Sequence, residues 1–187
     1  MEIHLIRHTK PNIAKNVCYG QSDVGLLDSY DLEKSEFSKK LSQNYDAVFS
    51  SPLSRCLRLA NDLNIGEALT DKRLMEYNFG QWEGRAWDEI PKKELDPWMS
   101  DFVNYPAPDG ESLKLMFERV KNFIDELSNK EYNKVLIVSH SVVIRCFWAY
   151  TLEIPLQNLF RIKVEFGDIW QFNIDSQANY RSFIGMK

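Results

Sequence analysis

The chain has 187 residues, of which 44% are hydrophobic and 27% are charged, and this is enough for one globular domain with a sizeable core. Its formal net charge of −4 argues against a general nucleic-acid or membrane-surface role, but it is compatible with a local basic pocket. No apolar run has the length of a membrane span, and the N-terminus lacks the features of a signal peptide. The three cysteines form no CxxC spacing, so we expect free thiols in a cytoplasmic protein.

The first predicted element is a short apolar run that ends in two cationic side chains. Residues 3–6 predict a strand, and Pro11 bounds it. Such an early strand in an α/β chain is usually central in its sheet and buried on both faces. Arg7 and His8 then lie at its carboxyl end, where open α/β sheets bind ligands. An arginine fork suits phosphate oxygens and a neutral imidazole can attack phosphorus, so this strand end predicts phosphate chemistry.

Two later apolar runs end in a similar way. The predicted strand 47–49 is followed by a helix, opened by Pro52, that carries Arg55 in its first turn. The predicted strand 134–138 is followed by Ser139 and His140 and then by another helix. We therefore expect three strands to bring phosphate ligands to the same edge of one sheet.

The remaining elements follow from hydrophobic periodicity. Helices are predicted over residues 31–41, 52–66, 111–128 and within 90–105, and strands over residues 160–166, 169–174 and 180–184. The predicted inward face of the long helix consists of Leu115, Val120, Phe123, Ile124 and Leu127. Residues 74–84, with two glycines and three aromatic residues, predict an irregular loop. This alternation predicts an α/β fold with a largely parallel sheet, helices on both faces and antiparallel strands added late.

Four stretches in this order resemble the histidine phosphatase superfamily, also called phosphoglycerate mutase-like. They are Arg7-His8, Ser51-Pro52-Leu53-Ser54-Arg55, Glu76 within Glu-Tyr-Asn-Phe-Gly, and Ser139-His140. Within the superfamily the chain is most similar to the α-ribazole phosphatases of cobalamin biosynthesis, through Cys-Tyr-Gly-Gln-Ser-Asp-Val-Gly-Leu at 18–26 and Phe-Gly-Gln-Trp-Glu-Gly at 79–84. The resemblance covers about the whole chain. It implies a single histidine phosphatase domain over residues 1–187, folded as a three-layer α/β/α sandwich.

The resemblance also implies a metal-independent phosphomonoesterase. His8 would be the nucleophile and form a phosphohistidine, while Arg7, Arg55 and His140 would surround the phosphate oxygens. Glu76 would protonate the leaving oxygen and then activate water, with Glu83 as the competing carboxylate. No cofactor or metal is required, because the cations are side chains. The implied substrate is a small phosphomonoester, with α-ribazole 5′-phosphate preferred over a sugar phosphate or a broad range of esters.

Several positions depart from the superfamily pattern or stay open. Thr9 and Ser141 stand where a glycine usually follows each histidine, and either Asn12 or Asn16 could contact phosphate. Arg145 is expected on the helix surface or in an ion pair. Four aromatic residues are candidates for stacking on a substrate base, namely Tyr19, Trp82, Trp87 and Trp98.

Three other kinds of protein fit this sequence less well. A zinc hydrolase would need several of the histidines, but His4 and His8 are roughly 13 Å apart along a strand, so one metal cannot accept both. His4 is therefore expected to be structural. A non-catalytic phosphate-binding protein would keep the arginines without a competent acid, and a phosphoglycerate mutase resembles a longer chain. We expect no nucleic-acid or membrane partner, and a monomer or homodimer.

Overall fold

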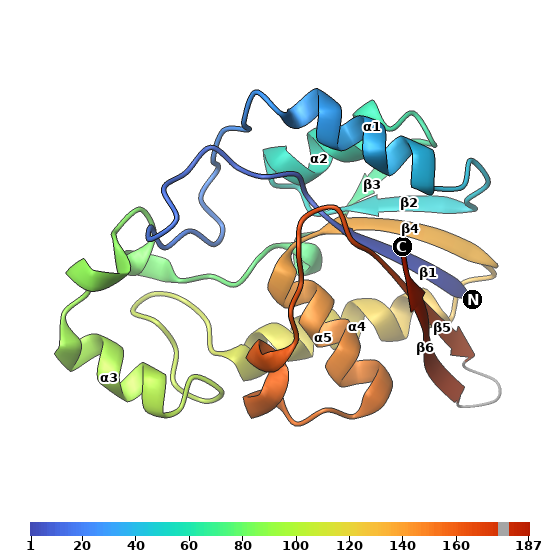
Figure 1. The fold of residues 1–187 in the computed structure, drawn as a ribbon. Coiled ribbons are helices and arrows are strands. Elements are labelled where there is room, and N and C mark those ends of the chain that lie inside the picture. The colour runs from blue at the N-terminus through green and yellow to red at the C-terminus, as the bar shows by residue number, and fades with distance from the viewer. Residues whose placement is uncertain (176–179) are drawn as a thin grey trace.

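The structure is a computed structural model that describes residues 1–175 and 180–187, and a six-stranded sheet forms its centre (Figure 1). The strands are β1 (Glu2–Arg7), β2 (Ala47–Ser50), β3 (Ala68–Thr70), β4 (Lys134–Ser139), β5 (Ile169–Asp175) and β6 (Tyr180–Met186), in the order β3-β2-β4-β1-β5-β6. Strands β1 to β4 run parallel to one another. Strand β5 pairs antiparallel with β1, and β6 pairs antiparallel with β5. The predicted mostly parallel sheet with a central first strand is confirmed.

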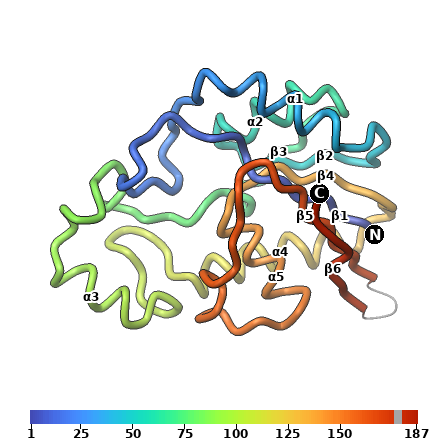
Figure 2. Tube along the Cα trace, viewed as in Figure 1, coloured from blue at the N-terminus to red at the C-terminus, as the bar shows by residue number. Residues whose placement is uncertain are grey.

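Helices cover both faces of this sheet, as Figures 1 and 2 show. One face carries α1 (Tyr30–Lys40) and α2 (Ser54–Asp62), and the opposite face carries α4 (Leu113–Ser128) and α5 (Ser141–Leu152). The short helix α3 (Lys92–Ser100) lies beyond the sheet, at the left of both views. Four 3₁₀ turns join these elements: η1 (Lys72–Leu74), η2 (Gly80–Trp82), η3 (Trp87–Glu89) and η4 (Leu156–Arg161). The three-layer α/β/α sandwich is therefore confirmed.

Side-chain alternation along β1 divides the core into two parts. Ile3 and Leu5 are fully buried against the α4 and α5 side, whereas Ile6 is fully buried among side chains of α1 and α2. Such alternation is the consequence of a strand period of two residues. Because apolar side chains of β1 are buried on both faces of the sheet, the packing of the core fixes β1 at the centre of the sheet and so fixes where its carboxyl end lies.

The carboxyl ends of β1, β2 and β4 meet at one edge of the sheet. In the parallel register Arg7 is paired with Ser139, and Ser50 of β2 is paired with Val138. His8 and His140 are thus the first residues after two adjacent strands, as the sequence predicts.

The structure differs from the sequence prediction at three places. Residues 160–166 form no strand; they belong to η4 and an irregular segment, in which Arg7 Nη1 donates to the carbonyl of Val164 at 3.0 Å. Leu115 is 60% exposed, because the helix turns Leu113 and Met116 into the core instead. The three-residue strand β3 was not predicted, since it is a short edge strand held by β2 alone.

Candidate active site

The two histidines at the strand ends form the centre of the site. His8 is 1% exposed and His140 is fully buried, and their ring centroids are 5.1 Å apart. The His8 amide donates to the carbonyl of Ser139 at 3.0 Å, which extends the β1–β4 pairing by one residue. The pairing of two central strands therefore determines the spacing of the two imidazoles.

The His8 ring has a defined tautomer. Its Nδ1 lies 2.7 Å from the Thr9 carbonyl oxygen, which can only accept, so Nδ1 carries the proton and Nε2 keeps its lone pair. Burial lowers the pKa of His8 well below its usual range, and the positive charges of Arg55 and Arg7 lower this pKa further. Burial, followed by His8 and Arg55, lowers the pKa of His140 in the same direction. Both imidazoles are neutral at neutral pH.

Two arginines that form no ion pair among the described residues flank these two histidines. Arg55 is fully buried and donates to the carbonyls of Ser22 at 2.9 Å and Gly20 at 2.6 Å. The Cζ of Arg7 lies 3.7 Å from the ring centroid of Phe166. The Nε atoms of both arginines are buried without a partner, and neither forms an ion pair within residues 1–175 and 180–187. A buried guanidinium such as that of Arg55, and the half-buried one of Arg7 beside it, are stabilised by a bound anion.

Glu76 reaches the same site from the loop after η1 and lies at the N-terminus of α5. Its Oε1 accepts from the amides of Tyr77 at 3.0 Å and Val142 at 3.2 Å. Its Oε2 accepts from the amide and the hydroxyl of Ser141, at 3.1 and 3.2 Å. The hydroxyl of Ser141, which stands where a glycine is usual, is therefore hydrogen-bonded to the Glu76 carboxylate. The other such hydroxyl, Thr9 Oγ1, is buried and has no hydrogen-bond partner among the described residues.

Glu83, the other candidate carboxylate, has a different environment. It accepts from the backbone amides of Gln21, Ser22 and Phe79 and does not line the pocket that contains Glu76. The structure thus places Glu76 in the pocket that Arg7 lines, bonded to Ser141, the residue after His140, and places Glu83 among the surrounding loops.

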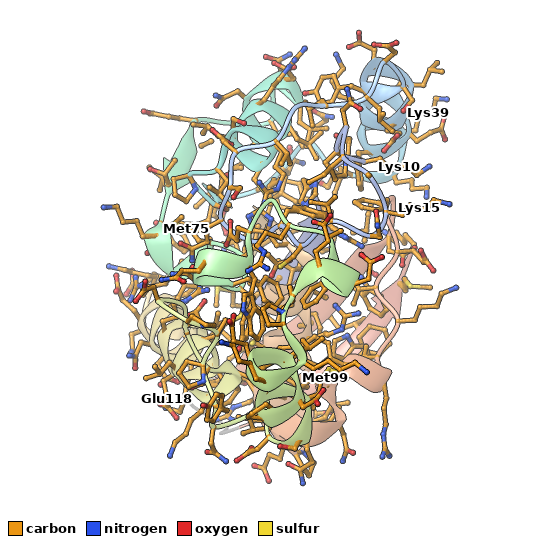
Figure 3. The ribbon with its side chains drawn as sticks, turned by 90° about the vertical axis from the view of Figure 1, so that its left-hand side faces the viewer. Lys10, Lys15, Lys39, Met75, Met99 and Glu118 are labelled. Atoms are coloured by element: carbon orange, nitrogen blue, oxygen red, sulfur yellow. The ribbon has the colours of Figure 1, made fainter. Side chains whose placement is uncertain are left out.

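A pocket of about 290 Å³ opens beside Glu76 and Arg7. Its walls include four aromatic side chains, those of Tyr19, Phe79, Trp87 and Phe160. Lys15 and Arg145 add two positive charges. A second pocket of about 370 Å³ shares Arg7, Lys15 and Tyr19 and is also lined by Lys10. Figure 3 shows Lys10 and Lys15 on this face of the molecule.

Of the four stacking candidates, Tyr19 and Trp87 line the pocket, whereas Trp82 and Trp98 are buried in the main core. Arg145 is half-buried on α5, so its expected place on the helix surface is met in part. Its Nε donates to the Ile162 carbonyl at 3.0 Å, it forms no ion pair among the described residues, and it lines the pocket.

The two asparagines and His4 lie away from these pockets. Asn12 and Asn16 are exposed and line neither pocket. His4 is buried, and its ring is hydrogen-bonded to Tyr45 and Gln171, so its predicted structural role is confirmed. Within residues 1–175 and 180–187, no group of three or more His, Cys, Asp or Glu side chains could hold a metal ion.

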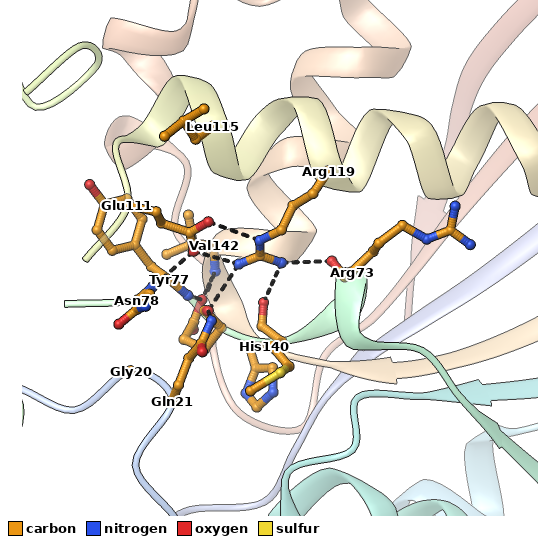
Figure 4. A network of polar contacts seen from close by, with 12 residues as sticks. Gly20, Gln21, Arg73, Tyr77, Asn78, Glu111, Leu115, Arg119, His140 and Val142 are labelled. Atoms are coloured by element: carbon orange, nitrogen blue, oxygen red, sulfur yellow. Dashed lines mark hydrogen bonds and ion pairs between the residues drawn. The ribbon is translucent and has the colours of Figure 1, made fainter. Parts of the chain in front are cut away.

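Sequence reasoning missed Arg119, which holds the loop that carries Glu76 (Figure 4). Its guanidinium donates to the carbonyls of Arg73, Met75 and Glu76, at 2.6, 2.8 and 3.0 Å. It also pairs with Glu111 at 2.6 Å. An arginine on the amphipathic helix α4 carries no local signal of this role, because all of its loop partners are more than 40 positions away in sequence.

Comparison with known proteins agrees with this geometry. The sequence profile of the histidine phosphatase superfamily (branch 1) matches residues 3–181, and the chain belongs to this superfamily. It is a phosphoric monoester hydrolase. A Salmonella typhimurium adenosylcobalamin/alpha-ribazole phosphatase is 29% identical over 177 residues, covering 89% of this chain and 87% of the relative. Phosphoserine phosphatase 1 of Hydrogenobacter thermophilus is 28% identical over 168 residues, covering 82% and 74%.

Among solved structures, the alpha-ribazole phosphatase from Shigella flexneri has a TM-score of 0.89 at 22% identity and covers 98% of this chain and 95% of its own. This similarity confirms the phosphoglycerate mutase-like fold. No helix among the described residues is both long and apolar enough to cross a membrane.

The lowered pKa values of the histidines predict acid-sensitive stability. The unfolded chain takes up protons near the reference pKa of about 6.5, whereas buried His8 and His140 do not, so the free energy of unfolding falls as pH drops below about 6.5. Each histidine contributes up to about 1.4 kcal/mol per pH unit. Urea unfolding between pH 7.5 and pH 5 measures this slope. We expect His8→Asn to reduce the slope by about one proton, and an unchanged slope would show that His8 is protonated in the folded state.

Proposed function

We propose that this protein is a metal-independent phosphomonoesterase that acts through a phosphohistidine on His8. The observation that carries the proposal is a neutral imidazole with a free Nε2 beside buried Arg55 and half-buried Arg7, neither of which forms an ion pair among the described residues. A phosphate dianion supplies the missing negative charge and puts phosphorus within reach of the nucleophile. We further propose that residues 1–187 form one domain of a cytoplasmic monomer or homodimer.

The proposed reaction has two steps. In the first, His8 Nε2 attacks phosphorus, the bond to the leaving oxygen breaks, and Glu76 gives that oxygen a proton. In the second, Glu76 takes a proton from water, which attacks the phosphohistidine and releases inorganic phosphate and neutral His8. Arg7, Arg55 and His140 donate to the equatorial oxygens, where charge accumulates in both transition states. The side-chain cations fulfil the role that a metal has in other phosphatases.

For the substrate we propose α-ribazole 5′-phosphate. The aromatic walls of the pocket beside Glu76, formed by Tyr19, Phe79, Trp87 and Phe160, suit a flat base at the far end of the leaving group. The similarity to a relative named for this activity supports the same substrate. Sugar phosphates and a broad range of phosphomonoesters are the alternatives.

One observation favours a second candidate, a phosphorylated carboxylic acid. Arg145 has no carboxylate partner among the described residues, and Lys15 lines the same pocket. A guanidinium with free terminal nitrogens binds a carboxylate well. The relative named phosphoserine phosphatase 1 makes phosphoserine the natural representative of this class.

A substrate panel in the presence of EDTA tests both candidates. We expect turnover of p-nitrophenyl phosphate without added metal, and the highest kcat/KM for α-ribazole 5′-phosphate among that ester, phosphoserine and glucose 6-phosphate. Arg145→Gln should leave this preference unchanged. If phosphoserine is instead the best substrate, and Arg145→Gln reduces its kcat/KM by about 10- to 100-fold but spares p-nitrophenyl phosphate, the second candidate replaces the first. Activity that requires a metal would contradict both.

A further inference from the structure

The two stretches that carry the resemblance to α-ribazole phosphatases, residues 18–26 and 79–84, are in contact. The Cys18 amide donates to the Arg85 carbonyl and the Gly84 amide donates to the Cys18 carbonyl, both at 2.8 Å. These bonds bring the loop that follows Cys18 against the turn that contains Glu83. The two stretches therefore form one structural unit next to the phosphate site.

The Glu83 carboxylate binds the loop from one side. Its Oε1 accepts from the Gln21 amide at 2.9 Å and from the Phe79 amide at 3.1 Å. Its Oε2 accepts from the amide of Ser22 at 2.6 Å and from the Ser22 hydroxyl at 2.5 Å. No cation pairs with Glu83 among the described residues, so its hydrogen bonds go to backbone and hydroxyl donors of these two stretches.

The same loop holds Arg55 from the other side. The carbonyls of Gly20 and Ser22 accept from its two terminal nitrogens, at 2.6 and 2.9 Å. A Cβ on Gly20 would lie 1.9 Å from the Tyr77 carbonyl oxygen, so a larger residue would displace the loop. Gln21 Nε2 also donates to the Glu76 carbonyl at 3.0 Å, and Figure 4 shows Gly20 and Gln21 beside Tyr77 and Asn78. The loop is thus fixed between the carboxylate of Glu83 and the guanidinium of Arg55.

We propose that Glu83 is a positioning residue for phosphate binding, acting through the loop 20–22 on Arg55. Two backbone amides converge on the carboxylate, and the carbonyls next to them aim the guanidinium. Without this acceptor the amides lose their partners, the carbonyls turn, and Arg55 loses its fixed direction. A displacement of about 1 Å at such a site can cost about 10²-fold in rate. This inference rests on the proposed function, in which Arg55 binds phosphate.

The test is a double-mutant cycle between Glu83→Gln and Arg55→Ala. The glutamine amide places N–H groups against some of the backbone donors, so it cannot replace the carboxylate. We expect Glu83→Gln to weaken orthovanadate inhibition about 10-fold and to lower kcat/KM by about 10- to 100-fold. Arg55→Ala should lower turnover by about 10²–10³-fold. In the Arg55→Ala background, Glu83→Gln should have almost no further effect, because residues that act as a unit are not additive.

The control is Glu94→Gln, which changes the same charge on a carboxylate that accepts from Trp82 Nε1 at 3.2 Å and has no bond to the loop. It should leave vanadate affinity unchanged. If Arg55→Ala leaves vanadate affinity unchanged, the proposed function fails. If Arg55→Ala weakens it but Glu83→Gln does not, or if the two effects multiply, only the positioning role fails. Should Glu83→Gln not fold, Glu83→Asp shortens the side chain by one methylene and draws the carboxylate away from the amides of Gln21 and Ser22, and a vanadate affinity equal to the wild type would then overturn the role of Glu83.

Discussion

Replacement of His8 by alanine should abolish turnover while the protein stays folded. In the proposed reaction His8 supplies the electron pair that displaces the leaving group, and removing such a nucleophile lowers kcat by about 10⁴–10⁶-fold. The free energy of unfolding should fall less steeply below pH 6.5 in this variant, since one histidine that resists protonation in the folded chain is removed. Steady-state rates with p-nitrophenyl phosphate, together with circular dichroism of the purified variant, measure both effects.

The intermediate gives a second readout for the same variant. An alkaline denaturing quench of wild-type enzyme with ³²P-labelled substrate should trap label that is stable to base and is lost on later treatment with acid, and His8→Ala should trap none. The matched control is His4→Asn, which removes another buried imidazole whose partners are Glu2, Tyr45 and Gln171 and which lines neither pocket. Labelling of His8→Ala, or substantial residual turnover, would show that another group attacks phosphorus.

Replacement of Glu76 by glutamine should lower the rate of phosphoryl transfer most for the substrates whose leaving oxygen is most basic. A ribose alkoxide is strongly basic and needs a proton to depart, whereas p-nitrophenolate hardly needs one. We expect a loss of about 10²–10⁴-fold with an alkyl phosphate, the range that general acid catalysis supplies. Phosphorylation of His8 by p-nitrophenyl phosphate should be much less affected. Burst kinetics must separate the two steps, because water also loses its base in the second one.

Glu83→Gln is the control for this leaving-group dependence. Glu83 is hydrogen-bonded to loop amides and does not line the pocket of Glu76, so its replacement should slow alkyl and aryl phosphates by similar factors. The opposite pattern, with leaving-group dependence in Glu83→Gln alone, would assign the acid to Glu83. If neither variant shows the dependence, the proton comes from another group and the proposed role of Glu76 is wrong.

Local sequence patterns determined most of the regular structure. The runs at 3–6 and 134–138 are continuously apolar because central strands are buried on both faces, and this pattern identified β1 and β4. The same reasoning failed at residues 160–166, where Val164 is buried but its carbonyl accepts from the Arg7 side chain instead of a neighbouring strand. A buried irregular segment and a buried strand have the same apolar sequence pattern, so only the folded structure distinguishes the two.

The centre of the site also follows from the sequence. Because parallel strands end at one edge, the residues after β1 and β4 had to meet, and His8 and His140 do so with ring centroids 5.1 Å apart. Arg55 follows from its place in the first turn of α2, directly after β2. These positions depend on strand order and on a few residues of local chain.

The tertiary structure alone decided what holds these groups in place. Glu83 reaches Arg55 through backbone atoms of residues 20–22, and Arg119 holds the Glu76 loop through three carbonyls. Every residue other than proline has the same backbone N–H donor and C=O acceptor, so the residue type of the loop that is held does not reveal these hydrogen bonds. The sequence by itself determined the fold class of this phosphatase and predicted the side chains that we propose to react. Their orientation depends on contacts between loops distant in sequence, which no periodicity encodes.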